Sequence, residues 1–251
     1  MNMRNLLRSE LRKLSTTAMP LAFVAVLVVL AGINAVAVVL GTDADGSKTF
    51  ISTAEDQRSL VAFAANATML AGLFGAIAVA REHAHGTVIH AFLAAPRRHR
   101  AVLAQFAAVG LGGALLGLLG AASTIVAVAL ALPTTEHGFL IPADGVAQVL
   151  AASTLCGAVG AVLGGAIAAL VRNTGGAVTG AVLVLLVAPP LVVQLASETM
   201  SWMPATLATV LSGVAVPEIE VEVAAAVAAI CLWAAVPAVL ALLAVQRRDV
   251  I

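Results

Sequence analysis

The chain has 251 residues, of which 61% are hydrophobic and only 10% are charged, and its formal net charge is zero. Because an ordinary soluble domain carries about a quarter charged residues, this composition excludes a typical soluble core and indicates a protein embedded in a bilayer. The absence of net charge excludes an overall electrostatic attraction to nucleic acid. Cys156 and Cys231 both fall within apolar runs, so we expect small buried thiols rather than a disulfide.

The first expected element is an amphipathic helix over residues 1–16. Leucines recur on one face at helical spacing, and basic residues occupy other positions, namely Arg4, Arg8, Arg12 and Lys13. A basic amphipathic helix of this kind is suited to lie along the membrane surface, in contact with lipid headgroups. We therefore assign these four cationic residues to a membrane-surface helix.

Six apolar runs follow, each long enough to cross the hydrocarbon core, which takes about 20 residues. They are residues 18–40, 59–80, 102–132, 145–171, 175–197 and 223–246. The first run is longer than the apolar core of a signal peptide and lacks a clean cleavage site followed by a soluble domain, so we expect a retained anchor. The sequence therefore predicts an all-α polytopic membrane protein, with residues 1–251 forming one transmembrane domain.

The positions of the basic residues predict the orientation of the chain. All Lys and Arg residues except Lys48 and Arg58 lie on one side, either before the first run or in the segments that follow the second, fourth and sixth runs. Most acidic residues lie on the other side, in the segments that follow the first, third and fifth runs. Cytoplasmic loops are enriched in Lys and Arg. We therefore expect a multi-pass protein of the plasma membrane of a bacterium, with both termini in the cytoplasm.

Glycine and proline patterns predict how the spans pack and bend. Three glycine pairs have GxxxG spacing, which lets helix backbones approach closely: Gly113 and Gly117, Gly160 and Gly164, and Gly176 and Gly180. Prolines within the later spans, Pro189-Pro190 and Pro237, are expected to kink or locally unwind their helices.

The segment 198–220, between the fifth and sixth runs, differs from a simple loop. It has acidic residues at both ends and an apolar middle, residues 201–216, that is too short to cross the membrane comfortably. We expect a re-entrant or interfacial helical hairpin on the outer face, with its break near Pro204 or Ser212-Gly213.

The spans lack the residues on which most intramembrane chemistry depends. Once their ends are trimmed they contain no Asp, Glu, Lys or Arg, which disfavours ion-coupled transport, and no histidine that would serve a protease. No catalytic, cofactor-binding or metal-binding residue is therefore assigned to this chain. Polar residues that remain within the spans are candidates to line a transport pathway, and they are Asn34, Asn66, Thr68, Gln148 and Gln194.

Residues 81–100, REHAHGTVIHAFLAAPRRHR, form a strongly basic loop between the second and third spans and contain four of the five histidines. His83 and His85 are two positions apart and do not share a helix face, which disfavours a metal site. The patch is short and lacks the interleaved aromatic residues of a nucleic-acid surface. The stretch 87–95 predicts a short helix with Val88 and Phe92 on one side, and we interpret it as a docking element for a soluble partner.

The spacing of residues in this loop resembles that of a known family. Glu82, then Gly86-Thr87, Leu93, and Pro96 followed by arginines are similar to the first cytoplasmic loop of type-2 ATP-binding-cassette (ABC) permeases. Residues 9–14, SELRKL, resemble the amphipathic N-terminal helix of that family, and residues 246–250, QRRDV, resemble its usual C-terminal end. Gln105 departs from the pattern, because many relatives have a lysine there.

The resemblance implies the membrane subunit of an exporter, in which a separate ATPase subunit binds ATP and Mg²⁺ and two identical or related permeases face each other. The loop would then carry a coupling helix that docks in a groove of the ATPase. The residues implied in this contact are Glu82, Gly86, Thr87, Val88, Ile89, Phe92, Leu93, Pro96, Arg97 and Arg98. Glu82 could form a salt bridge either with the N-terminal helix or with an arginine of the partner. The apolar spans favour export of a hydrophobic or amphipathic compound, such as a drug, lipid, peptide or natural product.

Two other functions stay open. A secondary transporter or channel would move its substrate along an ion gradient without ATP. A membrane scaffold or immunity protein would transport nothing, and binding of an ATPase would not be linked to substrate flux.

Overall fold

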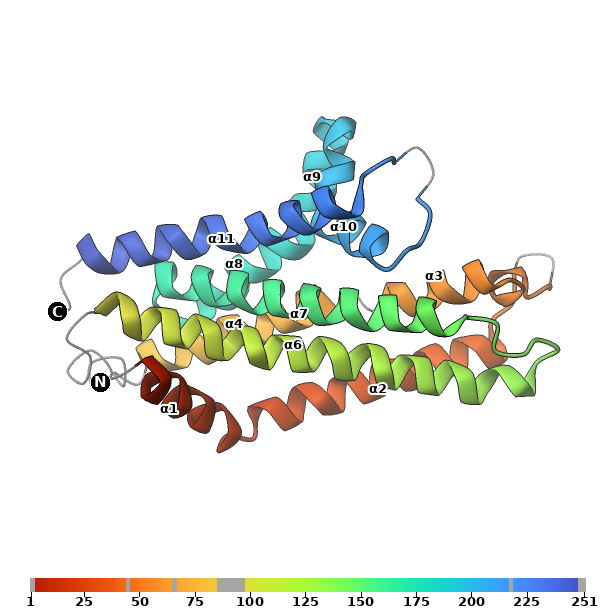
Figure 1. Ribbon diagram of the computed structural model, residues 1–251, viewed down its shortest axis with the longest axis horizontal. Helices are drawn as coiled ribbons and strands as arrows, with labels where there is room; N and C mark the ends of the chain where they lie inside the picture. The colour runs from red at the N-terminus through yellow and green to blue at the C-terminus, as the bar shows by residue number, and fades with distance from the viewer. Residues whose placement is uncertain (1–2, 44–45, 65–66, 85–97, 217–218, 248–251) are drawn as a thin grey trace.

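The computed structural model describes residues 3–43, 46–64, 67–84, 98–216 and 219–247, and these residues form helices and loops without a β-strand (Figure 1). Five helices are long and apolar enough to cross a membrane. They are Met19–Leu40, His99–Thr134, Ala143–Val171, Thr174–Leu195 and Val223–Gln246. The prediction of an all-α protein is therefore confirmed, and five of the six predicted spans correspond to helices that are long and apolar enough to cross a membrane.

The predicted second span, residues 59–80, differs from this group. The structure has two helices in its place, α3 (Ala54–Ala64) and α4 (Ala67–Ala84), and residues 65–66 between them lie outside the described residues. The first turn of α3 contains Glu55 and Asp56, and α4 ends in charged residues, so neither helix is an uninterrupted apolar run. Figure 1 places α4 along the middle of the bundle and α3 at one end of it.

The chain begins with α1 (Met3–Ser15) and α2 (Met19–Leu40). The Lys48 ammonium group donates hydrogen bonds to the carbonyls of Val38 and Val39, so it satisfies oxygens that the end of α2 leaves without a helical partner. A 3₁₀ turn (Thr49–Ile51) leads to α3, whose start is fixed by a reciprocal capping pair. The Thr53 amide donates to Asp56 Oδ2 at 3.0 Å and the Asp56 amide donates to Thr53 Oγ1 at 3.1 Å.

The centre of the bundle is α7 (Ala143–Val171), which packs between α4 and α6 (Arg98–Ala131). A methyl group added at Gly113 would collide with the carbonyl oxygen of Gly157, and one added at Gly160 would collide with that of Thr68. Gly117 and Gly164 are equally confined by backbone atoms of the facing helix. The predicted close contacts are thus confirmed for two of the three glycine pairs.

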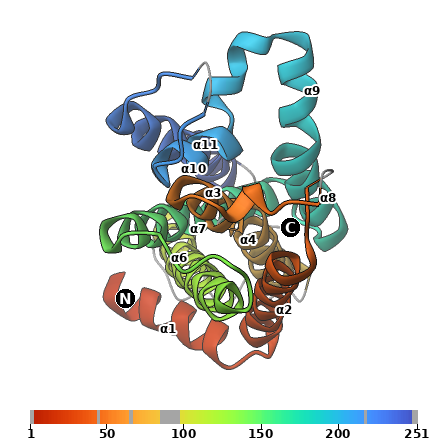
Figure 2. The same ribbon diagram turned by 90° about the vertical axis from the view of Figure 1, so that its right-hand side faces the viewer.

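The third pair has different neighbours. Gly176 lies against the side chains of Val171 and Asn173, and Gly180 lies against the side chain of Ile167. Both glycines belong to α8 (Thr174–Val182), which is followed by a π-helical turn (Leu183–Val187) and by α9 (Ala188–Leu195). The π turn immediately precedes Pro189-Pro190, where two missing amide protons interrupt the helical hydrogen bonds. In Figures 1 and 2, α9 extends away from the rest of the bundle.

The segment after α9 contains a 3₁₀ helix (Ser197–Trp202) and α10 (Pro204–Leu211), separated at Met203. One face of α10, including Leu207 and Leu211, is buried in a cluster with α7 and α11 (Val223–Arg247). A left-handed residue, Gly213 at φ +72°, follows α10. The chain thus changes direction at both of the alternative positions named for the break, Pro204 and Ser212-Gly213, whereas a re-entrant hairpin in the membrane stays a prediction. Helix α11 continues across Pro237 as one element.

Candidate functional site at the α1, α4 and α6 ends

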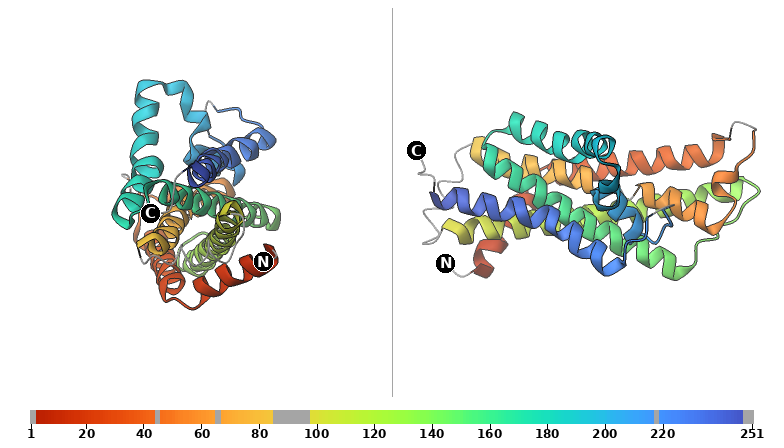
Figure 3. Two further views of the ribbon diagram at one scale, coloured as in Figure 1. Left: turned by 90° about the vertical axis from the view of Figure 1, so that its left-hand side faces the viewer. Right: turned by 90° about the horizontal axis from the view of Figure 1, so that it is seen from above.

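Helix α1 lies across one end of the bundle, beside the last turn of α4 and the first turns of α6 (Figures 1 and 3). Its Leu6 is only 4% exposed and packs against Ala101 and Ala104 of α6. The basic residues Arg4, Arg8 and Arg12 are exposed. Residues 3–15 thus form a helix with Leu6 against the bundle and three arginines at the surface, and its contact with a membrane stays a prediction.

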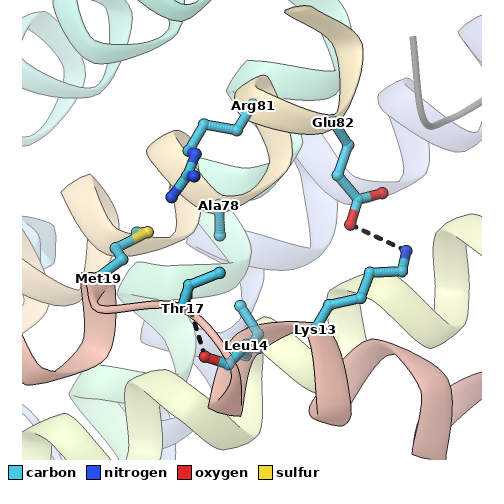
Figure 4. Close-up of a pocket in the computed structure, with 7 residues that line it drawn as sticks. All are labelled: Lys13, Leu14, Thr17, Met19, Ala78, Arg81 and Glu82. Carbon is cyan, nitrogen blue, oxygen red and sulfur yellow. Dashed lines mark hydrogen bonds and ion pairs between the residues drawn. The ribbon is translucent and has the colours of Figure 1, made fainter. Parts of the chain in front are cut away.

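A three-residue ion cluster joins α1 to α4. The Lys13 ammonium group donates to Glu10 Oε1 at 2.6 Å and to Glu82 Oε1 at 3.1 Å (Figure 4). Glu10 is 7% exposed, so this carboxylate is held where water reaches it poorly. Of the two partners expected for Glu82 from the sequence, the described structure has the one in the N-terminal helix.

The cluster perturbs the ionisation of its members. Burial, followed by repulsion from Glu82, raises the pKa of Glu10 against the opposing effect of Lys13. Burial by itself lowers the pKa of Lys13, but the hydrogen bond to Glu10 and the negative charge of Glu82 outweigh it, so the pKa of Lys13 is raised. The Lys13 ammonium group is thus shared between two carboxyl groups.

A hollow of about 200 Å³ opens next to this cluster (Figure 4). It is lined by residues from α1, from the start of α2 and from the last turns of α4, namely Lys13, Leu14, Thr17, Met19, Ala78, Arg81 and Glu82. Leu14, Met19 and Ala78 supply apolar surface, and Lys13, Arg81 and Glu82 supply charged groups. The hollow is thus amphipathic.

The loop that carries the family resemblance begins beside this cluster. Residues 85–97 lie outside the described residues, and this range holds the predicted partner contacts Gly86, Thr87, Val88, Ile89, Phe92, Leu93, Pro96 and Arg97. The loop leaves α4 three residues after Glu82 and rejoins the described chain at Arg98, the first residue of α6. Both helices that flank the loop, α4 and α6, therefore contact α1.

At the opposite end of the bundle, Arg58 connects three helices. Its Nε donates to the carbonyl of Ser212 at 2.9 Å, and its Nη2 donates to Gln148 Oε1. Gln148 in turn donates to the carbonyl of Leu211 at 3.1 Å. The two carbonyls lie at the end of α10, so α3 and α7 jointly hold that end in place. One signal in the sequence pointed to this role, namely that Arg58 and Lys48 are the only two basic residues predicted to lie on the outer side.

Gln57, adjacent to Arg58, is a second polar residue that the sequence did not single out. It is fully buried, and its amide donates to the carbonyls of Ile51 at 3.1 Å and Gly138 at 2.9 Å. Its carbonyl oxygen accepts a hydrogen bond from the Leu140 amide at 2.9 Å. Gln57 therefore satisfies three backbone groups of two neighbouring loops.

The candidate pathway residues have unrelated surroundings. Asn34 donates to the carbonyl of Leu30 in its own helix at 2.8 Å, Gln194 is exposed on α9, and Gln148 belongs to the Arg58 network. Thr68 is 3% exposed and faces Gly160. Asn66 lies outside the described residues. Lining of a transport pathway stays a prediction for all five.

No protein-family model matches this chain, and no curated protein matches it. Function must be inferred from its residues, their geometry and the resemblance of its loop. Within the described ranges, no group of three or more His, Cys, Asp or Glu side chains is placed to hold a metal ion.

Proposed function

We propose that this chain is the permease subunit of an ATP-driven exporter resembling the type-2 ABC permeases, with ATP and Mg²⁺ bound by a separate ATPase subunit. The observation that carries the proposal is the ion pair between Lys13 and Glu82. It joins the basic amphipathic helix to the last turn of α4, immediately before the loop whose residues resemble a coupling helix.

The contacts around the loop offer a route for mechanical coupling. If the ATPase displaced residues 85–97, the displacement would be transmitted directly to α4 and α6, to which the loop is attached. It would also reach α1 through the contacts of Lys13 and Leu6. Helices α4 and α6 are locked against α7 by backbone contacts at Gly160 and Gly113. Because close-packed helices move as a body rather than deform, these elements would be displaced together. Helix α9, which has no buried residue, is free to respond differently.

A six-span topology with both termini in the cytoplasm belongs to this proposal. The beginning of α1 and the end of α11 lie at the same end of the bundle (Figure 1). An even number of crossings returns a chain to the side from which it started, and five crossings would not. The α3–α4 pair supplies the sixth crossing, because α4 runs beside α6 and α7 within the bundle. The segment with α10 would then be the outer re-entrant hairpin.

The proposed cargo is a hydrophobic or amphipathic compound. Large apolar side chains are exposed along α2 and α11, including Leu21, Ile33, Leu232 and Leu240. In a bilayer these faces would contact lipid or a second permease. Closure of the ATPase pair on ATP would shift the permeases between two states, and the cargo would be moved because its affinity differs between them.

Site-directed crosslinking tests the proposal. Ile89→Cys, in the middle of the loop, is placed in a chain whose Cys156 and Cys231 are replaced, and the protein is purified from its native membranes. We expect an ABC-type ATPase to co-purify and to crosslink at residue 89. Leu40→Cys, which is 75% exposed at the other end of α2, is the matched control and should not crosslink to it.

Each other outcome has a defined meaning. Absence of an ATPase, together with uptake or efflux driven by an ion gradient, would replace the proposal with a secondary transporter or channel. An ATPase that binds the loop but hydrolyses ATP without any linked flux would favour a scaffold or immunity protein.

A further inference from the structure

The seam between α3 and α10 is incompletely packed. A hollow of about 270 Å³ lies between the two helices, and its lining includes Ala62 of α3, Ala208 and Thr209 of α10, and Met200. Figure 2 shows α3 beside α10 and α7. A different side of α10 is well packed, because Leu207 is fully buried in a cluster with α7 and α11. Helix α10 is therefore held by apolar contacts on its α7 and α11 side more than on its α3 side.

The Arg58 side chain bridges this seam. It belongs to α3, and the hydrogen bonds that it donates within the described chain go to the carbonyl of Ser212 and to Gln148 Oε1. Carbonyls at the C-terminal end of a helix lack helical partners and carry partial negative charge, so they suit a cation. Arg58 therefore caps α10 from another helix.

Two glycines leave room for the guanidinium group in this position. A Cβ added at Gly213 would collide with Arg58 Nη2, and one added at Gly145, in the first turn of α7, would lie 3.6 Å from Arg58 Cζ. The guanidinium group is thus seated between the end of α10 and the beginning of α7.

The partners of Arg58 allow its contacts to be broken and remade. Among the described residues the ion pairs are those of Lys13 with Glu10 and Glu82, so Arg58 has no carboxylate partner there. Breaking a buried ion pair is strongly unfavourable, because it leaves a charge uncompensated. Arg58 is only partly buried and is bonded to neutral oxygens, which it can exchange for water at a much smaller cost.

We infer that Arg58 is a latch: a positioning residue that holds the end of α10 against α3 and α7, and whose release opens the hollow to the outer side. Because the hollow interrupts apolar contact across the seam, the hydrogen bonds of Arg58 are a principal force that keeps it closed. The outer location rests on the orientation given under the proposed function. Under that function, an outward-opening movement would occur within one permease chain rather than between two.

The reactivity of a cysteine in the hollow tests the latch on the purified permease, without an ATPase. Ala208→Cys, at a position that is 6% exposed, is introduced after Cys156 and Cys231 have been replaced. Its rate of reaction with a charged methanethiosulfonate reagent is then measured. We expect Arg58→Gln to raise this rate about tenfold or more, since a charge-assisted hydrogen bond contributes about this factor to an equilibrium. Arg58→Lys, which keeps the charge, and Gln148→Leu, which removes one acceptor, should each give a smaller increase.

Two controls separate a latch from a general loss of stability. Ala168→Cys, at a buried position near the other end of α7, should react equally slowly with and without Arg58→Gln. Arg4→Gln, which removes an exposed arginine of α1, should leave the rate at Ala208→Cys unchanged.

The inference is overturned if Arg58→Gln leaves the rate at Ala208→Cys unchanged, or if it raises the rate at Ala168→Cys by the same factor. Should Arg58→Gln fail to fold, Gln148→Leu provides the same test, and an unchanged rate in that variant would also overturn the latch. Because no ATPase is present, failure here leaves the proposed function standing. Absence of an ATPase in the crosslinking experiment would likewise leave the latch standing.

Discussion

Lys13 Nζ lies 3.1 Å from Glu82 Oε1, although the two residues are 69 positions apart. The Lys13 side chain is 42% exposed and the Glu82 side chain 17%, and an ion pair with a solvent-accessible partner is worth about 0.5–1 kcal/mol. The contribution of this pair to the free energy of unfolding is therefore small. Its position is more informative, because it fixes α1 to the turn from which the basic loop departs.

Glu82→Ala is expected to leave the protein inserted and folded but to weaken coupling to the ATPase. Substrate-stimulated ATP hydrolysis by the complex should fall about tenfold or more. Without the ion pair between Lys13 and residue 82, a displacement of the loop would no longer move α1 together with α4. Gly86→Trp, within the loop, should have a similar effect. Glu55→Ala, which removes a carboxylate at the start of α3, is the control and should retain normal turnover. Full turnover in both loop variants would exclude the coupling role.

A charge swap tests whether the pair itself matters. Lys13→Glu places three carboxylates together and should destabilise the α1 contact, whereas Lys13→Glu combined with Glu82→Lys restores an attractive pair. Melting temperatures of the two single variants and the double variant give the coupling energy, expected at about 0.5–1 kcal/mol. Additive effects of the two substitutions would show that the contact contributes nothing.

The dependence of stability on pH should change when Lys13 is removed. Lys13→Gln leaves Glu10 beside Glu82 without a cation, so the pKa of Glu10, already raised by burial and by Glu82, should rise further. A carboxyl group whose folded pKa is raised contributes stability that is present below its unfolded pKa and lost as pH rises through the folded pKa. The variant should therefore lose more stability than the parent protein as the pH rises above the pKa of an unfolded glutamate.

Thermal melts in detergent at several pH values measure this effect. The double variant Lys13→Gln, Glu10→Gln removes the buried carboxyl group and should melt with the pH dependence of the parent protein or a weaker one. If Lys13→Gln alone already matches the parent above the pKa of an unfolded glutamate, Glu10 is not held in the buried arrangement described here.

The helix content and the tightest helix contacts could be read from the sequence because they depend on local composition. Apolar runs define five of the six predicted spans to within a few residues. Gly113 and Gly160 each have a second glycine four positions later, a spacing that permits close backbone approach. The α3–α4 pair was harder to foresee. Residues 59–80 form an apolar run, but α3 already begins at Ala54, and the polar Gln57 and Arg58 in it have tertiary partners that the run does not indicate.

The sequence predicted a polar contact only where the predicted membrane side limited the possible partners of a residue. Glu82 and the basic N-terminal helix were both expected on the cytoplasmic side, so this helix was one of the two expected partners of Glu82. The structure identifies Lys13 as the residue concerned. The Arg58 network joins residues 58, 148 and 211–212, and no periodicity or motif relates three positions so distant in sequence. Such contacts follow from the packing of α10 against α7, which the sequence did not specify.

The backbone contact between α6 and α7 should be intolerant of even one methyl group. Gly113→Ala is expected to destabilise the protein by about 1–3 kcal/mol, because the new carbon would collide with the Gly157 carbonyl and the helices would have to separate. Gly32→Ala is the matched control, since that glycine is also within a helix but has open space around its Cα. It should be neutral or stabilising, as alanine favours helix more than glycine does. Equal effects in a denaturant titration would contradict the close packing.

Gly213 is expected to be required both for its backbone conformation and for the space it leaves. Its φ of +72° is left-handed, and an added Cβ would collide with the Arg58 guanidinium and the Gln148 amide. Gly213→Ala should therefore cost about 1–2 kcal/mol for the conformation and a further amount for displacing Arg58.

Gly46→Ala provides the comparison, because Gly46 has a φ of +81° but no atom near its Cβ position. Thermal melting measures how much more Gly213→Ala destabilises the protein than Gly46→Ala does, and this difference is the cost of disturbing the Arg58 network. The difference should vanish when the two glycine substitutions are each made in a protein that already carries Arg58→Ala and Gln148→Ala. An excess that survives in this background would mean that the end of α10 is held by other contacts.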